Sequence, residues 1–316
     1  MATAGSCFAQ HIARHLRQAG LNYFVTETGN PFAPPDIVEK YGYGVFTARY
    51  GNIYTSRQLL QTIQRAYGVF EPIDDKWTGD GDCIVDPFRP RIQPGGFISI
   101  DEFELDREQH FCSIRDAIEH LDVLVFTLGL TETWFSRTDG AVFPICPGVA
   151  GGEYDETRYG FVNLTVADVV ADLKEAIRYL RSKNPSCRVI LTVSPVPLAA
   201  TAIDRSVLVS TVYSKSVLRV AAEEIAALDP GIAYFPSYEV ITGTYNRGSY
   251  FAQDLRSVTE AGVSHVMRLF LKHYAKGFEV HVDEAMVSDH DRNNAVRDSM
   301  GEALAVVCEE ESLANF

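Results

Sequence analysis

The residues best placed to do chemistry lie at the start of the chain. Ser6 follows the short run Ala2–Gly5 and precedes a stretch with helical periodicity. We therefore expect its hydroxyl at the carboxyl end of a strand, beside the free N–H groups of a helix. An acyl-transfer serine needs exposure, a proton acceptor and N–H donors near the oxyanion, and such a turn supplies the first and the last. The plainer interpretation is that Ser6 caps the helix.

The neighbouring Cys7 is a second possible nucleophile, because a helix start lowers the pKa of a thiol. Buried structural cysteines are nevertheless far commoner than catalytic ones. The six cysteines are scattered, with no C-x-x-C pair and no histidine at zinc-ligand spacing beside any of them. We interpret all six as reduced, mostly buried thiols and expect no metal site: Cys7, Cys83, Cys112, Cys146, Cys187 and Cys308.

The block Gly5–Ala9, with the sequence GSCFA, resembles the signature that names the GSCFA family. Members of this family resemble divergent relatives of the SGNH (GDSL-like) esterases and acetylhydrolases. The resemblance implies that Ser6 is the nucleophile. It continues through four later blocks: Tyr50–Asn52, Thr127–Trp134, Ser194–Pro197 and Tyr250–Asp254.

The resemblance also implies a set of oxyanion or substrate contacts. Gly51 matches a second-block glycine whose N–H helps to hold the oxyanion, and Asn52 follows it. The third block of the wider fold is Gly-x-Asn-Asp, and here Thr131 replaces the asparagine and Glu132 the aspartate. A hydroxyl can donate one hydrogen bond, although it is shorter than an amide. The alternative is that Thr131 and Glu132 belong to an ordinary turn at a strand end.

The last block departs from the wider fold, where it is Asp-x-x-His. Asp254 is present, but Ser257 stands where the histidine is expected. General-base help contributes roughly 10²- to 10⁴-fold, so another group must supply the base or the enzyme is weak. Asp254 itself is one candidate, at lower efficiency. Arg256 either pairs with Asp254 or anchors an anionic substrate group.

Histidines elsewhere in the chain are the other candidates for the base. His265 lies two helical turns beyond Ser257, and we take it as the first candidate, with a core or crevice histidine as the alternative. His110 could approach the crevice from the other side. His11 lies in the same predicted helix as Ser6 but is rotated off its face.

The elements that position these residues alternate along the chain. Asp122–Leu128 and Arg188–Ser194 are short apolar runs typical of buried parallel strands, and Ile232–Pro236 is a weaker third. Amphipathic helices separate them, which predicts an α/β fold: a three-layer α/β/α domain with a parallel sheet, SGNH- or flavodoxin-like. The helices are expected at Cys7–Ala19, Ser56–Tyr67, Thr165–Leu180, Ser206–Leu228 and Thr259–Tyr274.

Two irregular segments interrupt this order. Glu71–Phe103 is rich in Asp, Gly and Pro, and we expect an inserted loop excursion that serves as a lid or binding loop. Arg137–Tyr159 is the second. Aromatic residues near them form either a platform for a sugar ring or packing under a loop: Trp77, Phe88 and Trp134. We predict one domain over residues 1–286 and a peripheral helix or tail over 287–316.

Composition limits the partners and the location. The 316 residues carry a net charge of −14, which repels polyphosphate, so we expect no nucleic-acid partner. No apolar run reaches the length of a membrane span and no signal peptide is evident, so we expect a cytoplasmic protein without a membrane span. The absence of a Walker loop and of a G-x-G-x-x-G motif after a strand predicts no cofactor.

These observations lead to two hypotheses of different classes. The first is a serine esterase or O-acyl hydrolase acting on an acylated, carbohydrate-like or other small ester, or an acyltransferase that uses the same residues. The second is a catalytically impaired carbohydrate-binding module on the same fold. An imidazole within hydrogen-bond reach of Ser6 favours the enzyme.

Overall fold

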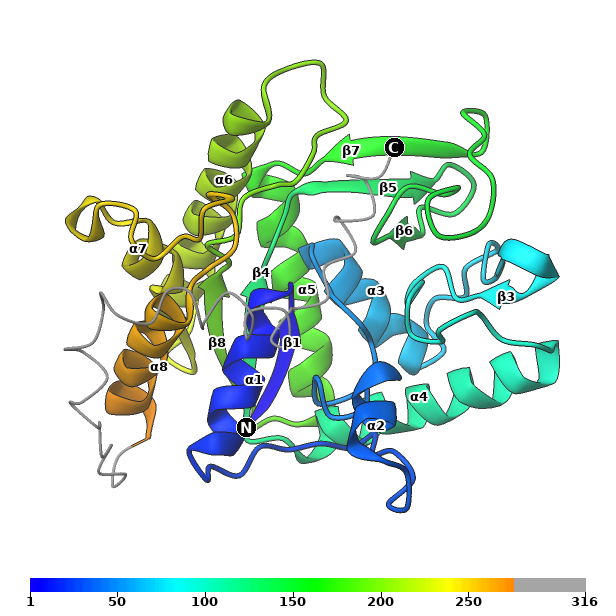
Figure 1. Cartoon of the computed structure of the whole chain (residues 1–316), viewed down its shortest axis with the longest axis horizontal. Coiled ribbons are helices and arrows are strands. Elements are labelled where there is room, and N and C mark those ends of the chain that lie inside the picture. The colour runs from blue at the N-terminus through cyan, green and yellow to red at the C-terminus, as the bar shows by residue number, and fades with distance from the viewer. Residues whose placement is uncertain (276–316) are drawn as a thin grey trace.

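A computed structural model describes residues 1–275 of the chain, so the predicted tail 287–316 lies outside the described residues. Its centre is a parallel sheet in the order β1-β4-β8-β9 (Figure 1). The two strongest predicted strands are neighbours in it, which confirms the expected parallel pair. The strands are β1 (Ala2–Gly5), β4 (Val123–Leu128), β8 (Arg188–Val193) and β9 (Ile232–Phe235).

Both faces of this sheet are covered by helices. Successive side chains of β4 point to opposite sides, so that Phe126 enters one core and Val125 the other. The first core contains α3 (Ser56–Ala66), α4 (Ile100–His120), α5 (Val166–Lys183) and α6 (Val207–Leu228). The second contains α1 (Phe8–Gln18), α7 (Ser237–Thr242) and α8 (Glu260–Tyr274). The fold is therefore the predicted three-layer α/β/α arrangement.

The helices begin where local hydrogen bonding favours a start. Thr55 and Gln58 form a capping box at α3, in which each side chain bonds the other residue's backbone N–H. Thr165 and Asp168 do the same at α5. The expected helices all appear, with boundaries shifted by at most three residues.

A small antiparallel sheet lies above the carboxyl ends of the parallel strands (Figure 1). It was not predicted, because its strands are short and Arg137–Tyr159 is rich in glycine and proline. Its order is β6-β5-β7, with β5 (Glu132–Ser136), β6 (Val142–Phe143) and β7 (Tyr159–Asn163).

The excursion before α4 packs against this small sheet. Trp77 is buried and lies 5.2 Å from Phe143 between ring centroids. Trp134 meets Tyr154 edge-on at 5.5 Å. Trp77 therefore packs against the small sheet and does not present a surface platform. The short elements here and elsewhere are α2 (Pro35–Lys40), β2 (Trp77–Thr78), η1 (Asp80–Asp82), β3 (Ile84–Val85) and η2 (Thr244–Asn246).

The cysteines are free thiols wherever the structure describes them. Cys7 and Cys187 are buried, but Cys83 and Cys146 are half-buried and Cys112 is exposed. The prediction of mostly buried thiols is therefore only partly correct. No described helix has the length and apolarity needed to cross a membrane.

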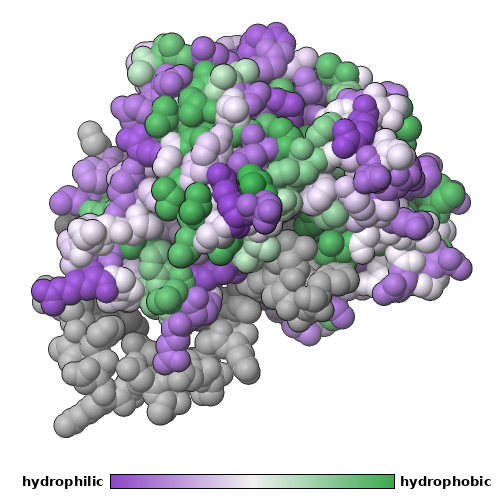
Figure 2. Space-filling model, turned by 90° about the horizontal axis from the view of Figure 1, so that it is seen from above, coloured by the Kyte–Doolittle hydropathy of each residue, from purple (hydrophilic) through white to green (hydrophobic). Residues whose placement is uncertain are grey.

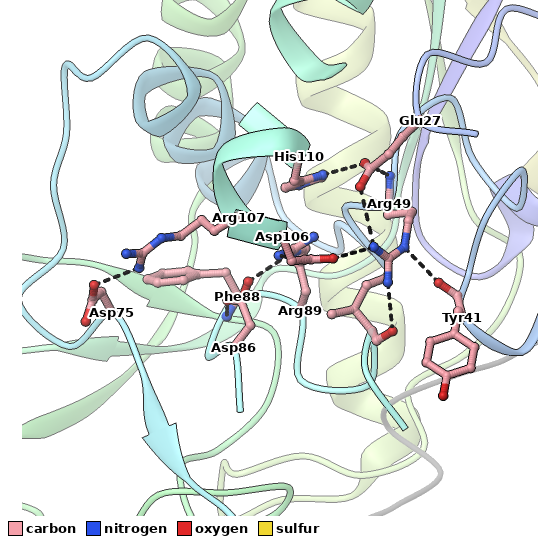
Figure 3. A network of polar contacts seen from close by, with 11 residues as sticks. Glu27, Tyr41, Arg49, Asp75, Asp86, Phe88, Arg89, Asp106, Arg107 and His110 are labelled. Atoms are coloured by element: carbon pink, nitrogen blue, oxygen red, sulfur yellow. Dashed lines mark hydrogen bonds and ion pairs between the residues drawn. The ribbon is translucent and has the colours of Figure 1, made fainter. Parts of the chain in front are cut away.

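A buried network of charges ties the loop regions to α4 (Figure 3). Arg49 donates to Asp106 at 2.6 Å and its backbone N–H donates to Glu27 at 2.7 Å. Arg89 bridges Asp86 at 2.7 Å and Asp106 at 2.8 Å. Such pairs add little net stability by themselves, but removing one partner leaves an uncompensated buried charge. The network therefore fixes the excursion in one position.

Folding changes the pKa of Glu27, one of the carboxylates in this network. Burial raises the pKa of Glu27, but the His110 ring, the Arg89 guanidinium and the amide of Arg49 outweigh it and lower the pKa to about 2. Because folding lowers this pKa, the carboxylate stabilises the fold above pH 4.5 or so, and the contribution is lost as the pH falls toward about 2.

We predict that Glu27→Gln lowers the free energy of unfolding at pH 7 by about 3 kcal/mol. The difference from the wild type should shrink between pH 4.5 and pH 2, as the wild-type carboxylate is protonated. Urea unfolding at a series of pH values measures this, with the exposed Glu71→Gln as the matched control. A difference that stays constant over that pH range would contradict the assignment.

Candidate active site

The turn that carries Ser6 depends on the glycine before it. Gly5 has a φ of 138°, and a Cβ at this position would lie 2.4 Å from the carbonyl oxygen of Thr127. Only glycine fits here, because L side chains rarely adopt this φ and the backbone of β4 leaves no space. The N–H of Ser6 then donates to the same Thr127 oxygen at 3.1 Å. The last residue of β1 is thus held directly against β4.

The Ser6 hydroxyl is buried and has no hydrogen-bond partner among the described residues. The sequence argument expected an exposed hydroxyl, but Ser6 is only 2% exposed. It also does not cap α1, since Cys7 occupies the N-cap position and no side chain bonds the first N–H groups. A buried hydroxyl without a partner is uncommon in native structures, because its desolvation is not offset by a hydrogen bond.

Tyr54 and Gly129 cover Ser6. A Cβ on Gly129 would lie 2.8 Å from the Ser6 Cβ and 3.2 Å from the Tyr54 ring. The Tyr54 carbonyl oxygen accepts from the N–H groups of Gly129 and Leu130, each at 2.9 Å. The segment just after the second block is therefore joined to the third block beside the serine. The face of the molecule seen from above in Figure 2 mixes polar and apolar side chains.

Helix α6 holds the third block from behind. Lys215 is 1% exposed and donates to the carbonyl oxygen of Gly129 at 2.7 Å. The Ser214 hydroxyl accepts from the N–H of Thr131 at 3.0 Å. Sequence analysis missed both residues. The available signal was a lysine within the apolar stripe of this helix, between Val212 and Val217.

The resemblance predicted that the backbone N–H of Gly51 holds the oxyanion. Its φ is 66°, and its N–H donates no hydrogen bond within residues 1–275. The chain is brought to Ser6 two residues later, where the N–H of Ile53 donates to the carbonyl oxygen of Gly5 at 2.8 Å. Asn52 is buried, and its side-chain oxygen accepts from Gln10 of α1 at 3.0 Å.

Two further donors of the site, the N–H of Ser6 and the hydroxyl of Thr131, form hydrogen bonds within the protein. The N–H of Ser6 donates to the carbonyl oxygen of Thr127. The Thr131 hydroxyl donates to the side-chain oxygen of Asn163 at 2.6 Å. Glu132 accepts from the Thr201 hydroxyl at 2.7 Å and from the N–H of Ala202 at 3.3 Å, so it anchors the loop after β8.

Asp254 and Ser257 form a closed turn of their own. The Asp254 carboxylate accepts from the backbone N–H of Arg256 at 3.0 Å and of Ser257 at 2.9 Å, and also from the Ser257 hydroxyl. Burial raises the pKa of Asp254, but these hydrogen bonds outweigh it and the pKa falls below its ordinary value. Asp254 is therefore charged at neutral pH and already occupied by the residue that replaces the expected histidine.

The candidate histidines form hydrogen bonds with other side chains. His265 shares a hydrogen bond of 2.7 Å with the Tyr250 hydroxyl, and burial followed by the charge of Arg268 lowers its pKa. His110 bonds Glu27 at 2.7 Å in the charge network. Within the described range, no hydrogen bond joins either ring to Ser6 or to Asp254. No cluster of potential metal ligands occurs in the same range.

The comparison with known families agrees with this arrangement of blocks. The profile of the GSCFA family matches residues 1–270. The chain belongs to the GSCFA family. No curated protein matches the sequence. One solved crystal structure is similar over 52% of this chain and 70% of its own, at 15% identity and a TM-score of 0.29, which is too low to carry an argument.

In this GSCFA protein, the packing of Gly129 on Ser6 is directly testable. We predict that Gly129→Ala destabilises the fold by about 1–3 kcal/mol, because the new methyl group overlaps Ser6 and Tyr54. The double variant Ser6→Gly/Gly129→Ala should recover part of that loss, since it removes one of the two overlapping atoms. Urea unfolding of the four proteins gives the coupling free energy. Strictly additive effects would show that the two residues do not touch.

Proposed function

We propose that this protein is a serine ester hydrolase that acts on a small or carbohydrate-like acyl ester. The observation that carries the proposal is the Ser6 hydroxyl, which is buried, lacks a hydrogen-bond partner in the described part of the chain and stands before the first turn of α1. A structural serine would bond a neighbour, whereas a nucleophile must keep its hydroxyl for the substrate and the base. Family membership supports the same assignment.

The proposed reaction is a two-step acyl transfer. The Ser6 Oγ attacks the ester carbonyl carbon while its proton passes to the base, and the C–O bond to the alcohol breaks as the alcohol takes up that proton. Water then attacks the acyl-serine and releases the acid. In the transferase variant, a sugar hydroxyl replaces water. The Gly51 N–H and the positive end of α1 support the transient oxyanion.

Asp254 and His265 are the proposed sources of the base. Asp254 is charged, and a serine at position 257 already occupies one of its oxygens. His265 is neutral at physiological pH, because its pKa is lowered, and its second ring nitrogen is left for a proton. Arg256 is proposed to contact substrate. We also propose a single domain over residues 1–286 and a cytoplasmic location, as composition suggests.

Ser257, which stands where the wider fold has a histidine, supports a second candidate, a carbohydrate-binding module. Ser257 cannot accept the Ser6 proton as an imidazole would. A protein that lost this base would keep the crevice and its binding contacts while losing turnover. Measured turnover by the wild-type chain separates the two candidates.

We predict that a fluorophosphonate probe labels the wild-type chain at Ser6 and fails to label Ser6→Ala. The substitution should leave the free energy of unfolding unchanged or slightly higher, because it removes a buried hydroxyl that makes no hydrogen bond. Peptide mass spectrometry locates the label, and Ser182→Ala, at an exposed helix position, is the matched control. Equal labelling of Ser6→Ala would remove Ser6 as the nucleophile.

We predict that Ser257→His raises turnover of an activated aryl acetate by about tenfold or more. The imidazole would stand beside Asp254, where the Ser257 hydroxyl now lies, and an aspartate there orients the ring as a base. Ser257→Asn, which fills the space without a base, is the control. A folded Ser257→His variant with no gain, alongside a wild type without turnover that binds a sugar, would favour the binding module.

A further inference from the structure

Helix α6 packs on one face of the parallel sheet and leaves an apolar stripe on its outer side (Figure 1). Four apolar side chains of the stripe are exposed: Leu208 at 73%, Val209 at 53%, Val212 at 64% and Val220 at 47%. Because Val209, Val212, the exposed Ser216 and Val220 follow one another at intervals of three or four residues, they lie on one side of the helix. Single exposed apolar residues are ordinary, whereas a contiguous stripe of them marks an interaction surface.

The inner side of α6 already has its partners within the chain. Val217, Leu218 and Ala221 are buried in the first core. Ser214 and Lys215 bond the backbone of the third block. The exposed stripe therefore contributes nothing to the core or to the site around Ser6.

Opposite charges lie at the two ends of the stripe. Arg205 stands just before the helix, where its Nε donates to the Ser210 hydroxyl at 2.9 Å and its guanidinium carbon lies 5.3 Å from the Tyr213 ring centroid. The exposed Glu224 lies three helical turns beyond Tyr213, and so on the same flank of the helix. Within residues 1–275, neither Arg205 nor Glu224 forms an ion pair.

We infer that this stripe is a homodimer interface, in which α6 packs antiparallel against α6 of a second copy of the chain. A two-fold interface requires a surface that complements itself after rotation. With the axis passing between Ser214 and Lys215, Val209 lies level with Val220 of the second copy, because both are equally far along the helix from that point. The inference goes beyond the proposed function and does not rest on Ser6 being a nucleophile.

The same register also pairs the charges. Arg205 and Glu224 are equally far from the axis on one flank, so each faces the opposite charge of the second copy. Parallel packing would instead place Arg205 against Arg205 and Glu224 against Glu224. Near the axis, Val212 faces the small Ser216 of the second copy, which lets the two helices approach closely. Charge complementarity therefore favours an antiparallel second copy as the occupant of this face.

The length of the paired stretch sets the strength of the dimer. From Arg205 to Glu224 the face is about 28 Å long, at 1.5 Å per residue. One helix pair of this length buries less than the roughly 800 Å² per partner that is standard for stable complexes. We therefore expect a reversible dimer with a Kd of about 1–100 µM.

Sedimentation equilibrium of the full chain, over a concentration series that spans this Kd, tests the inference. The wild type should pass from monomer to dimer. Val212→Glu should weaken association about tenfold or more, because it places like charges near the axis; glutamate is a good helix former, so the fold is retained. Ile73→Glu, at an exposed apolar site outside α6, is the matched control and should associate as the wild type does.

A chain that stays monomeric over the whole series would overturn the inference. So would a Val212→Glu variant that associates as tightly as the wild type. If Val212→Glu fails to fold, Val220→Glu replaces it, and undiminished association of that variant counts equally against the interface.

Cross-linking tests the antiparallel register. Val209→Cys and Val220→Cys chains are prepared separately in a Cys112→Ser background, which removes an exposed thiol, and are then mixed and oxidised. Peptide mass spectrometry should find a disulfide that joins position 209 of one chain to position 220 of another. A dimer without this link, or with links between like positions only, would overturn the antiparallel pairing.

Discussion

The close approach of Gly5 to Thr127 is the contact on which the rest of the site depends. A side chain at position 5 would overlap the backbone of β4, so β1 could not end where it does. Two hydrogen bonds lie at this contact: the N–H of Ser6 donates to Thr127, and the N–H of Ile53 donates to the carbonyl oxygen of Gly5. Gly5, which has no side chain, thus sets the direction of α1. It also brings the segment that contains Gly51 beside the serine.

The second layer of support comes from residues distant in the sequence. Tyr54, which follows the second block, accepts from the N–H of Gly129, and Lys215 and Ser214 of α6 bond the backbone of the third block. The fully buried Lys215 keeps its bond to a backbone carbonyl inside the core, where an unpaired ammonium would be costly. The result is a buried serine hydroxyl that forms no hydrogen bond with any described residue, which suits a preorganised reaction centre.

Sequence patterns predicted the parts of this structure that depend on local periodicity. Apolar runs at 122–128 and 188–194 predicted the parallel strands, and amphipathic patterns predicted helices such as Thr165–Leu180, because each signal lies within one short segment. The antiparallel sheet around Glu132–Ser136 was not predictable in this way, since its two-residue strand and glycine-rich loops carry little pattern. The position of Ser6 at the end of a strand was predicted. Its burial and the hydrogen bond from the Thr131 hydroxyl to Asn163 were not, because both arise from contacts between distant segments.

The central claim is that Ser6 carries the acyl group, and trapping the acyl-enzyme tests it most directly. The full chain is mixed with an activated aryl acetate, quenched in acid within the first turnovers and digested for peptide mass spectrometry. The account predicts an acetyl ester on Ser6 that forms and decays with turnover and is absent from Ser6→Ala. Acetylation of the adjacent Cys7 alone, or turnover without any acyl group on Ser6, would contradict it.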